Sequence, residues 1–155
     1  MATLWLLFAF SLPAFADASD VNAFVAFTNN CTDAVLISRC PTPVENIYWL
    51  KTRSTYILSI STTENNTFTA GPGGLTEAVF IGRRFHPLQY GLSVKRGFDI
   101  GMQILPINTF SYKIRTPLTC TNATCAGSKD GMQLTSMTEV DELASNFEIT
   151  FCPDD

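Results

Sequence analysis

The chain has 155 residues, a formal net charge of −4 and 46% hydrophobic residues. A nucleic-acid binder or a binder of anionic membrane surfaces would show a clustered excess of Lys and Arg, and 10 such residues against 14 Asp and Glu exclude that class. The length allows one hydrophobic core, so we expect one domain.

The first sixteen residues (MATLWLLFAFSLPAFA) have the features of a secretory signal peptide. They contain no charged side chain, an apolar run at residues 4–10 and a final A-x-A cleavage site. The run is far shorter than the roughly 20 residues that a membrane-spanning helix needs. The sequence therefore predicts a signal peptide at residues 1–16, a single mature domain at residues 17–155, and a secreted, extracellular product.

Most of the mature sequence consists of short runs that are typical of β-strands. Residues 21–27 alternate apolar and polar side chains, and several later runs are rich in β-branched and aromatic residues. Gly, Pro and Asn clusters at residues 65–66, 71–74 and 106–108 predict turns between the runs. In chain order, strands are predicted at residues 21–27, 34–37, 47–50, 56–60, 78–81, 90–94, 110–114 and 147–151.

The predicted fold is all-β. Many short strands joined by turns favour an antiparallel β-sandwich, because a sheet with one apolar face has to cover it with another sheet. Residues 136–145 (SMTEVDELAS) are the one candidate helix, with Glu139 three residues after Ser136 as in a capping box. The sequence favours neither a helix nor a loop for this segment.

The cysteines point to an oxidising compartment. There, cysteines form disulfides more often than they form catalytic or metal sites, and an odd number leaves at least one without a partner in the chain. Cys120 and Cys125 form a C-x4-C pair, but a zinc site would need further ligands at suitable spacing. Neither a metal nor a cofactor is therefore expected. The five residues are Cys31, Cys40, Cys120, Cys125 and Cys152.

Three N-glycosylation sequons accompany the cysteines. Each lies among turn-forming residues, where a bulky glycan can project outward. We therefore expect a glycoprotein, with acceptors at Asn30, Asn65 and Asn122.

Three stretches together resemble the thaumatin-like (pathogenesis-related) protein family. FVAFTNNCTDAV at residues 24–35 is similar to the family's first strand, which ends in Asn-Asn-Cys. GLTEAVFIGRRFHPLQYGLSVKRGFDIGMQILP at residues 74–106 resembles a T-x-A-E-F block followed by a D-[FY]-Y-D-[IV]-S-L-V-D-G-F-N-x-P-M block. FEITFCPDD at residues 147–155 is close to the family's aromatic-Cys-Pro ending. Their order and rough spacing agree with the family, so the resemblance implies a thaumatin-like sandwich.

The resemblance also implies how the cysteines are used. In the family, the cysteine after the first strand is bonded to the one just before the C-terminus, which implies a disulfide between Cys31 and Cys152. The family's C-x4-C pair, matched by Cys120 and Cys125, bonds to a second, loop-rich domain. The 26 residues between Cys125 and Cys152 contain no cysteine, which implies a short or missing second domain. Cys120 then pairs with Cys125, or Cys40 takes one of the two, and both alternatives stay open.

Many thaumatin-like proteins have an acidic cleft that is proposed to bind or hydrolyse β-1,3-glucan. Hydrolysis needs two carboxyl groups roughly 5 to 9 Å apart. Glu77 matches the Glu of the T-x-A-E-F block, and Asp99 lies where the family has Asn. Gly91 and Arg96 replace two of the family's aspartates. The resemblance therefore implies that Glu77 and Asp99 are the two acids retained from this cleft, and the sequence itself favours the alternative that both are solvated residues of turns or sheet edges.

Basic side chains crowd the same block of sequence. Nearby cations hold a carboxylate ionised and oppose a general-acid role. The group favours an ordinary solvated sheet edge, which discourages aggregation between sheets, and the alternative is a site for an anion or an acidic partner such as a sulfated or uronic polysaccharide. His86 is the only histidine, and without a G-x-S-x-G motif it predicts no Ser-His-Asp hydrolase. The basic residues are Arg83, Arg84, His86, Lys95 and Arg96.

Exposed aromatic rings are a second way to hold a sugar, because a ring face packs against the apolar face of a pyranose. Alternation along a sandwich strand sends half of its aromatic side chains to the core. The face on which Trp49 lies does not follow from the sequence. The candidates are Tyr48, Trp49, Tyr56, Phe85 and Tyr90.

The sequence therefore predicts a secreted, glycosylated, monomeric thaumatin-like protein with a role in defence or host interaction. It would bind a polysaccharide such as β-glucan, or an extracellular protein, without catalysis. The first alternative is a weak β-1,3-glucanase or antifungal wall-perturbing protein that uses Glu77 and Asp99. The second alternative is a secreted effector or enzyme inhibitor. The ligand-binding candidates are Glu77, Asp99, Arg83, Arg84 and Arg96.

Overall fold

The computed structural model describes residues 22–40, 43–84, 86–107, 117–125, 129–136 and 146–153. These residues form strands and loops and contain no helix, which confirms the all-β expectation. The expected signal peptide lies outside the described residues. The strands are β1 (Asn22–Asn29), β2 (Val35–Cys40), β3 (Glu45–Leu50), β4 (Thr55–Ser61), β5 (Asn66–Ala70), β6 (Glu77–Ile81), β7 (Gln89–Ser93), β8 (Met102–Ile107), β9 (Leu118–Cys120), β10 (Met132–Ser136) and β11 (Asn146–Phe151).

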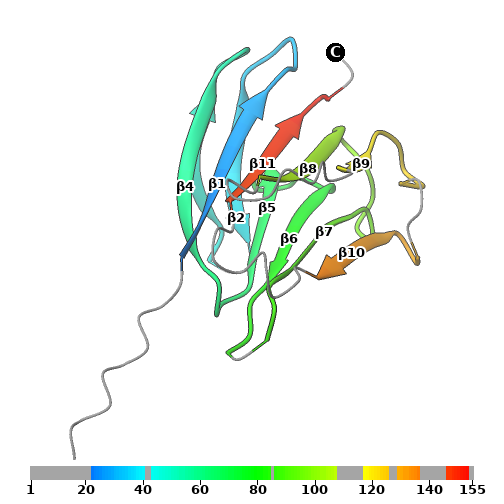
Figure 1. Cartoon of the computed structure of the whole chain (residues 1–155). Helices are drawn as coiled ribbons and strands as arrows, with labels where there is room; N and C mark the ends of the chain where they lie inside the picture. The colour runs from blue at the N-terminus through cyan, green and yellow to red at the C-terminus, as the bar shows by residue number, and fades with distance from the viewer. Residues whose placement is uncertain are drawn as a thin grey trace, which may run out of the picture.

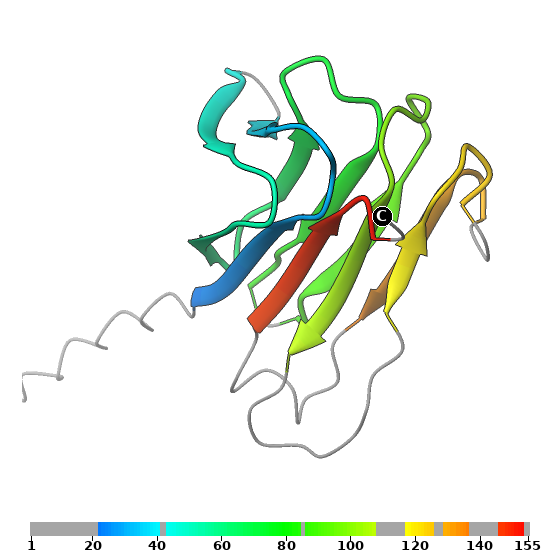
Figure 2. The same ribbon diagram turned by 90° about the horizontal axis from the view of Figure 1, so that it is seen from above.

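Two sheets make up the sandwich (Figure 1). One has five strands in the order β4-β1-β11-β8-β9, and the other has six in the order β10-β7-β6-β5-β2-β3. Every neighbouring pair is antiparallel except β1 and β11, which run parallel with Asn29 opposite Phe151. Figure 2 shows β11 between β1 and β8, so the first and last described strands lie side by side. The prediction of a mostly antiparallel sandwich is confirmed, and the parallel pair β1–β11 is a feature that the sequence did not predict.

A row of aromatic rings fills the core between the sheets. The rings come from both sheets, and successive centroids are 5.0 to 6.4 Å apart, mostly in edge-to-face or tilted geometry. Each fully buried phenylalanine contributes about 1.5–3 kcal/mol relative to an exposed one. In order, the row is Phe151, Phe27, Phe68, Phe80, Phe147 and Tyr90.

Two of the predicted turns are partly wrong. Asn66 begins β5, where it pairs with Phe80 of β6. Pro106 lies inside β8, opposite Phe147 of β11. On its other side β8 is covered by β9 only from Met102 to Ile104, so the missing N–H of Pro106 removes no hydrogen bond from that ladder.

The predicted strand at residues 110–114 lies outside the described residues, and so does most of the candidate helix at residues 136–145. Ser136, the first residue of that candidate, is the last residue of β10. β10 pairs with β7 from Met132 opposite Ser93 to Ser136 opposite Gln89. A segment that the sequence assigned to no element therefore forms an edge strand.

A disulfide joins the two parallel strands just beyond their ends. Cys31 is bonded to Cys152, with Cα atoms 5.1 Å apart and 121 positions between them in sequence. The N–H of Asn30 donates to the carbonyl oxygen of Phe151 at 3.1 Å, which continues the strand pairing up to the bond. This is the pairing that the family resemblance implied.

The other two bonded cysteines close a short ring after β9. Cys120 is bonded to Cys125, with Cα atoms 4.4 Å apart, and Cys40 is buried and unpaired among the described cysteines. Of the two alternatives for Cys40, the structure contains the one in which it keeps a free thiol.

Candidate functional site

Glu77 lies at the first position of β6, between β5 and β7. Its side chain is only 15% exposed, and its Oε1 accepts a hydrogen bond from Nη1 of Arg96 at 3.2 Å. Arg96 lies in the turn after β7. The carboxylate of Glu77 is therefore paired with the cation that replaces one of the family's aspartates.

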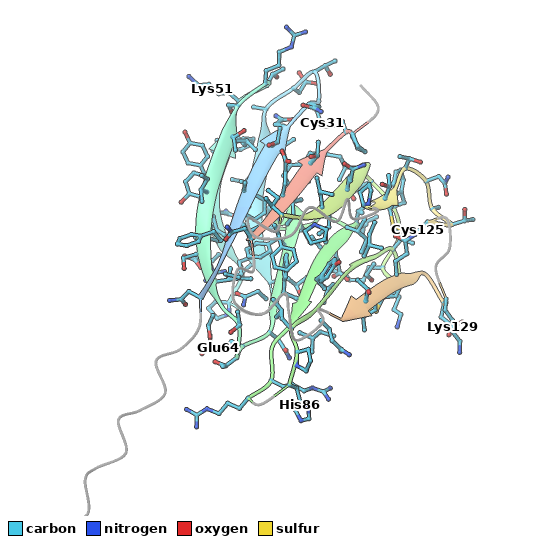
Figure 3. The ribbon with its side chains drawn as sticks, in the orientation of Figure 1. Cys31, Lys51, Glu64, His86, Cys125 and Lys129 are labelled. Atoms are coloured by element: carbon cyan, nitrogen blue, oxygen red, sulfur yellow. A yellow bond between two sulfur atoms is a disulfide. The ribbon has the colours of Figure 1, made fainter. Side chains whose placement is uncertain are left out.

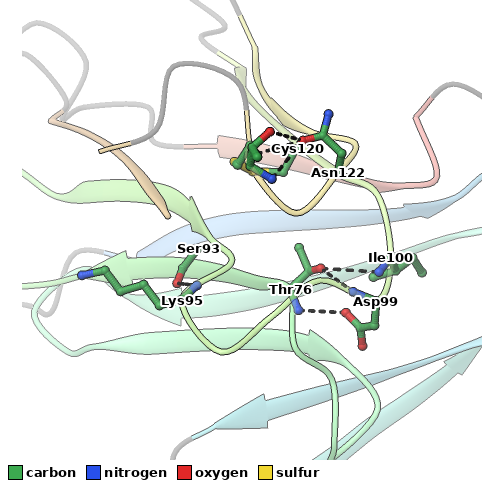
Figure 4. The surroundings of a disulfide bond; sticks show 9 residues. Thr76, Ser93, Lys95, Asp99, Ile100, Cys120 and Asn122 are labelled. Atoms are coloured by element: carbon green, nitrogen blue, oxygen red, sulfur yellow. Dashed lines mark hydrogen bonds between the residues drawn. A yellow bond between two sulfur atoms is a disulfide. The ribbon is translucent and has the colours of Figure 1, made fainter. Parts of the chain in front are cut away.

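Asp99 holds the loop after β7 against the segment that leads into β6 (Figure 4). Its two carboxylate oxygens accept hydrogen bonds from the N–H groups of Leu75 and Thr76, at 2.9 and 2.8 Å. In return, the hydroxyl oxygen of the buried Thr76 accepts from the N–H groups of Asp99 and Ile100, at 3.3 and 3.4 Å. The contacts are reciprocal, so Asp99 fixes the local fold.

The structure brings Glu77 and Asp99 to the same end of β6, because the Asp99 carboxylate accepts a hydrogen bond from the N–H of Thr76, the residue before Glu77. A glycosidase needs one carboxyl group that donates a proton and a second that attacks the sugar or activates water. Here both carboxylates accept hydrogen bonds from the protein's own guanidinium and backbone groups. This arrangement favours a structural role for both acids over hydrolysis.

Gly91 of β7 lies in close contact with the backbone of β10. It lies opposite Leu134 of β10 and Val79 of β6. A Cβ atom at this position would collide with the backbone carbonyl oxygen of Gln133, so glycine allows the close approach of the β10 backbone. A larger side chain, including an aspartate, does not fit beside β10 at this position.

The β6–β7 hairpin divides the basic block of the sequence. Arg83, Arg84 and His86 lie in the connection between the two strands and are exposed, with His86 at the lower tip of the molecule in Figure 3. Lys95 and Arg96 follow β7 at the opposite end of the hairpin, about 13 Å away along strands that rise about 3.3 Å per residue. The basic residues therefore form two groups, one at each end of the hairpin.

The aromatic candidates differ in how far their rings are exposed. Tyr90 is buried and packs against Phe147 in the core, and Phe85 lies outside the described residues. Tyr48 is 46% exposed and Trp49 is 63% exposed. Tyr48 stacks on Tyr56, with ring centroids 4.6 Å apart. Tyr48 and Trp49 therefore offer ring surface to a ligand, and Tyr90 does not.

The pairing of β3 with β2 explains the exposure of Trp49, and it becomes irregular only beyond Tyr48. The register between β2 and β3 shifts between Ile37 and Ser38, so Ile37 pairs with Tyr48 while Ser38 pairs with Asn46. Trp49 lies opposite Leu36, which alternation places on the outer face of the sheet because its neighbours in β2 are buried.

An open hollow of about 380 Å³ lies at this edge of the sheet. Its lining is apolar and aromatic with one amide side chain, and it includes none of the acidic or basic candidates from the sequence. The lining residues are Leu36, Asn46, Ile47, Tyr48 and Trp49.

The three sequon asparagines are exposed in loops, where a glycan has room. Asn30 follows β1, Asn65 precedes β5 and Asn122 follows β9. The Oδ1 atom of Asn122 accepts hydrogen bonds from the N–H and the hydroxyl of Thr124, at 3.0 and 2.6 Å. Glycosylation at these positions stays a prediction.

Within the described part of the chain, no three His, Cys, Asp or Glu side chains lie close enough to hold a metal ion. The same residues contain no helix with the length and hydropathy to cross a membrane.

No protein-family model matches the sequence, and no curated protein matches it. Solved structures match the fold. The structure of the thaumatin-like xylanase inhibitor TLXI aligns with a TM-score of 0.60 at 15% identity, covering 83% of this chain and 99% of that chain. The crystal structure of the protein elicitor MoHrip2 from Magnaporthe oryzae aligns with a TM-score of 0.57 at 15% identity, covering 84% and 98%. The chain has the thaumatin-like fold, and the resemblance seen in the sequence is confirmed at this level.

Proposed function

We propose that this chain is a non-catalytic binding protein of the extracellular space, with a polysaccharide or a protein as its partner. The observation that carries the proposal is that both candidate carboxylates already have partners within the protein. Glu77 is paired with Arg96, and Asp99 accepts hydrogen bonds from two backbone N–H groups. The same fold leaves the Trp49 ring largely in water beside an open hollow. Such a surface is suited to contact rather than to hydrolysis.

Secretion and glycosylation belong to the same proposal. The two disulfides suit an oxidising compartment, and the predicted signal peptide supplies the route. Mass spectrometry of the secreted protein is expected to find Asp17 as the first residue and a glycan on at least one of Asn30, Asn65 and Asn122. A retained N-terminus, or no glycan at any sequon, would contradict this part of the proposal.

Co-sedimentation with insoluble β-1,3-glucan tests the central claim. The expected result is depletion of the protein from the supernatant without release of reducing sugar. Release that disappears in the double variant Glu77→Gln, Asp99→Asn would instead establish the glucanase alternative. The glucan result and the sugar assay together separate a binding protein from an enzyme.

Inhibition of a polysaccharide-degrading enzyme is the second candidate function. The observation that favours it is the match over 99% of the chain of a thaumatin-like xylanase inhibitor. This inhibitor and the elicitor with the same fold are in keeping with a role in defence or host interaction. Addition of the purified protein to microbial xylanases is expected to lower their rate of xylan hydrolysis in a saturable manner. Unchanged rates at protein in large excess would exclude this candidate.

A further inference from the structure

We infer that the hollow beside Trp49 is a subsite for an uncharged, linear glycan whose pyranose rings carry equatorial hydroxyl groups. The inference rests on the proposed binding function and adds a location and a ligand class to it. The site is distinct from the end of β6 where Glu77 and Asp99 lie, since neither residue lines the hollow.

The Trp49 ring is the first reason. At 63% exposure, it leaves a large apolar surface in water, whereas a row of aromatic rings elsewhere in the fold fills the core. A tryptophan side chain has only two rotatable bonds, so its ring loses little conformational freedom when a ligand covers it. The apolar C–H face of an equatorially substituted pyranose offers a flat surface of matching character.

The polar group of the hollow is the second reason. Ser38 donates from its hydroxyl to Oδ1 of Asn46 at 2.9 Å, which orients the Asn46 amide. Among the described residues, Nδ2 of Asn46 has no hydrogen-bond partner, and Asn46 is exposed. An amide nitrogen carries two N–H donors, so it can donate to a sugar hydroxyl at the edge of a ring stacked on Trp49.

The lining of the hollow offers no counter-charge to an acidic ligand. None of the five lining residues is charged. The ion pair between Arg39 and Glu45, 3.6 Å apart, joins β2 to β3 and offers no unpaired cation. A uronic or sulfated chain would lose hydration here without gaining a counter-charge, whereas a neutral glycan has no such cost.

The position of β3 is the third reason. It is an edge strand of the six-stranded sheet, so a linear chain can pass along it without meeting a neighbouring strand. The irregular register at Ile37 and Ser38 changes the direction in which β3 side chains point. Irregularities of this kind occur beside many binding sites. The stack of Tyr48 on Tyr56 holds the strand in place.

Tryptophan fluorescence provides a direct test. The sequence has two tryptophans, Trp5 and Trp49, so Trp49 is the single reporter once the predicted signal peptide is removed. The probes are soluble β-1,3-gluco-oligosaccharides, β-1,4-xylo-oligosaccharides and oligogalacturonate. We expect at least one neutral probe to shift the emission to shorter wavelength and to protect the ring from iodide quenching, and the charged probe to do neither.

Variants then locate the site. Calorimetry is expected to show that Trp49→Ala weakens binding of the neutral probe at least about tenfold, the effect of truncating a central aromatic contact, and that Trp49→Phe keeps part of the affinity. Phe24→Ala is the matched control, because Phe24 is 53% exposed on a strand of the other sheet and its loss is expected to leave binding unchanged. Unchanged thermal unfolding of each variant verifies that its fold is intact.

The outcomes separate the subsite from the proposed function. Equal affinity of Trp49→Ala and the wild-type protein would overturn the subsite and leave non-catalytic glycan binding in place. Binding of oligogalacturonate alone, or of no probe while a xylanase is inhibited, would also overturn the subsite but not the binding function. Sugar release that needs Glu77 and Asp99 would overturn the non-catalytic function whatever Trp49 does.

Discussion

Tyr48 of β3 and Tyr56 of β4 lie face to face, with ring centroids 4.6 Å apart and ring planes 10° from parallel, although the two strands belong to different sheets. Both strands are sheet edges, and residues 51–54 connect them. The pair therefore bridges the two sheets at the side of the sandwich where Trp49 presents its ring.

Removal of either tyrosine ring is expected to loosen this edge. Aromatic pairs in double-mutant cycles are coupled by about 0.5–1.5 kcal/mol, so Tyr48→Ala and Tyr56→Ala should destabilise the fold less in combination than their single effects add up to. Chemical denaturation of the wild-type protein, both single variants and the double variant measures the coupling. Strict additivity would mean that the stack contributes nothing to stability.

The hydrogen bonds of Asp99 predict a stability effect at a residue that sequence reasoning treated as a catalytic candidate. Asp99→Ala removes the acceptor of two backbone N–H groups, and we expect a loss of about 1–3 kcal/mol of unfolding free energy. Asp33→Ala is the control, because Asp33 is also exposed but contributes only its backbone carbonyl to a hydrogen bond among the described residues. Equal losses of unfolding free energy in the two variants would show that the hydrogen bonds of the Asp99 carboxylate do not stabilise the fold.

Asn29 organises the end of β1 and is fully buried. Its amide nitrogen donates to the carbonyl oxygens of Asp33 and Leu50, each at 2.9 Å, and its Oδ1 accepts from the N–H of Cys31 at 2.9 Å. Asn29→Ala leaves these three groups without their partner, and we expect a loss of about 1–3 kcal/mol. Asn22→Ala, at the exposed start of the same strand, should change the midpoint of urea unfolding little. The hypothesis fails if both variants unfold at the wild-type midpoint.

The disulfide between Cys31 and Cys152 closes a loop of 121 residues. The chain-entropy model assigns such a loop about 5 kcal/mol, because the bond restricts the unfolded chain. The double variant Cys31→Ala, Cys152→Ala should therefore be much less stable than the wild-type protein. Cys40→Ala provides the comparison, since it removes a buried thiol without removing a cross-link. A double variant no less stable than Cys40→Ala would contradict the model.

Gly91 predicts a steric effect. Gly91→Ala places a methyl group against the carbonyl oxygen of Gln133, so we expect β10 to be displaced and about 1–3 kcal/mol of stability to be lost. Gly73→Ala is the matched control, because no atom lies within 4 Å of a Cβ at that position. Hydrogen exchange of the β10 amides should report the displacement. Protection of β10 unchanged in Gly91→Ala would show that the contact is easily relieved.

The sequence pattern predicted the strands whose side chains alternate, and the family resemblance implied the disulfide between Cys31 and Cys152. In β1 and β11, every second side chain is buried, so the pattern reports the face directly. It failed at β5 and β8, where Asn66 and Pro106 are turn-forming residues inside strands. Their pairing depends on neighbours far along the chain, which no local pattern reveals.

The candidate site was harder to predict for the same reason. Glu77 is paired with Arg96, 19 positions later, because a hairpin folds the chain back on itself, and the same hairpin separates Arg84 from Arg96. Trp49 lies on the outer face because β3 pairs with β2 so that Trp49 is opposite Leu36, and this pairing is not visible in the local sequence. The sequence shows that these acidic, basic and aromatic residues are present. Which of them contact one another depends on how the strands are arranged in the fold.

The bond between Cys31 and Cys152 also determines how the molecule responds to mechanical tension. Force applied at the two ends of the chain passes through β1 to Cys31, crosses the sulfur bridge to Cys152 and leaves through the last residues. Strands β2 to β11 lie inside the bridged loop and outside this path. A pull that detaches β1 can therefore release only the segment from Asn22 to Cys31, while the rest of the sandwich stays unstretched until the bridge is reduced.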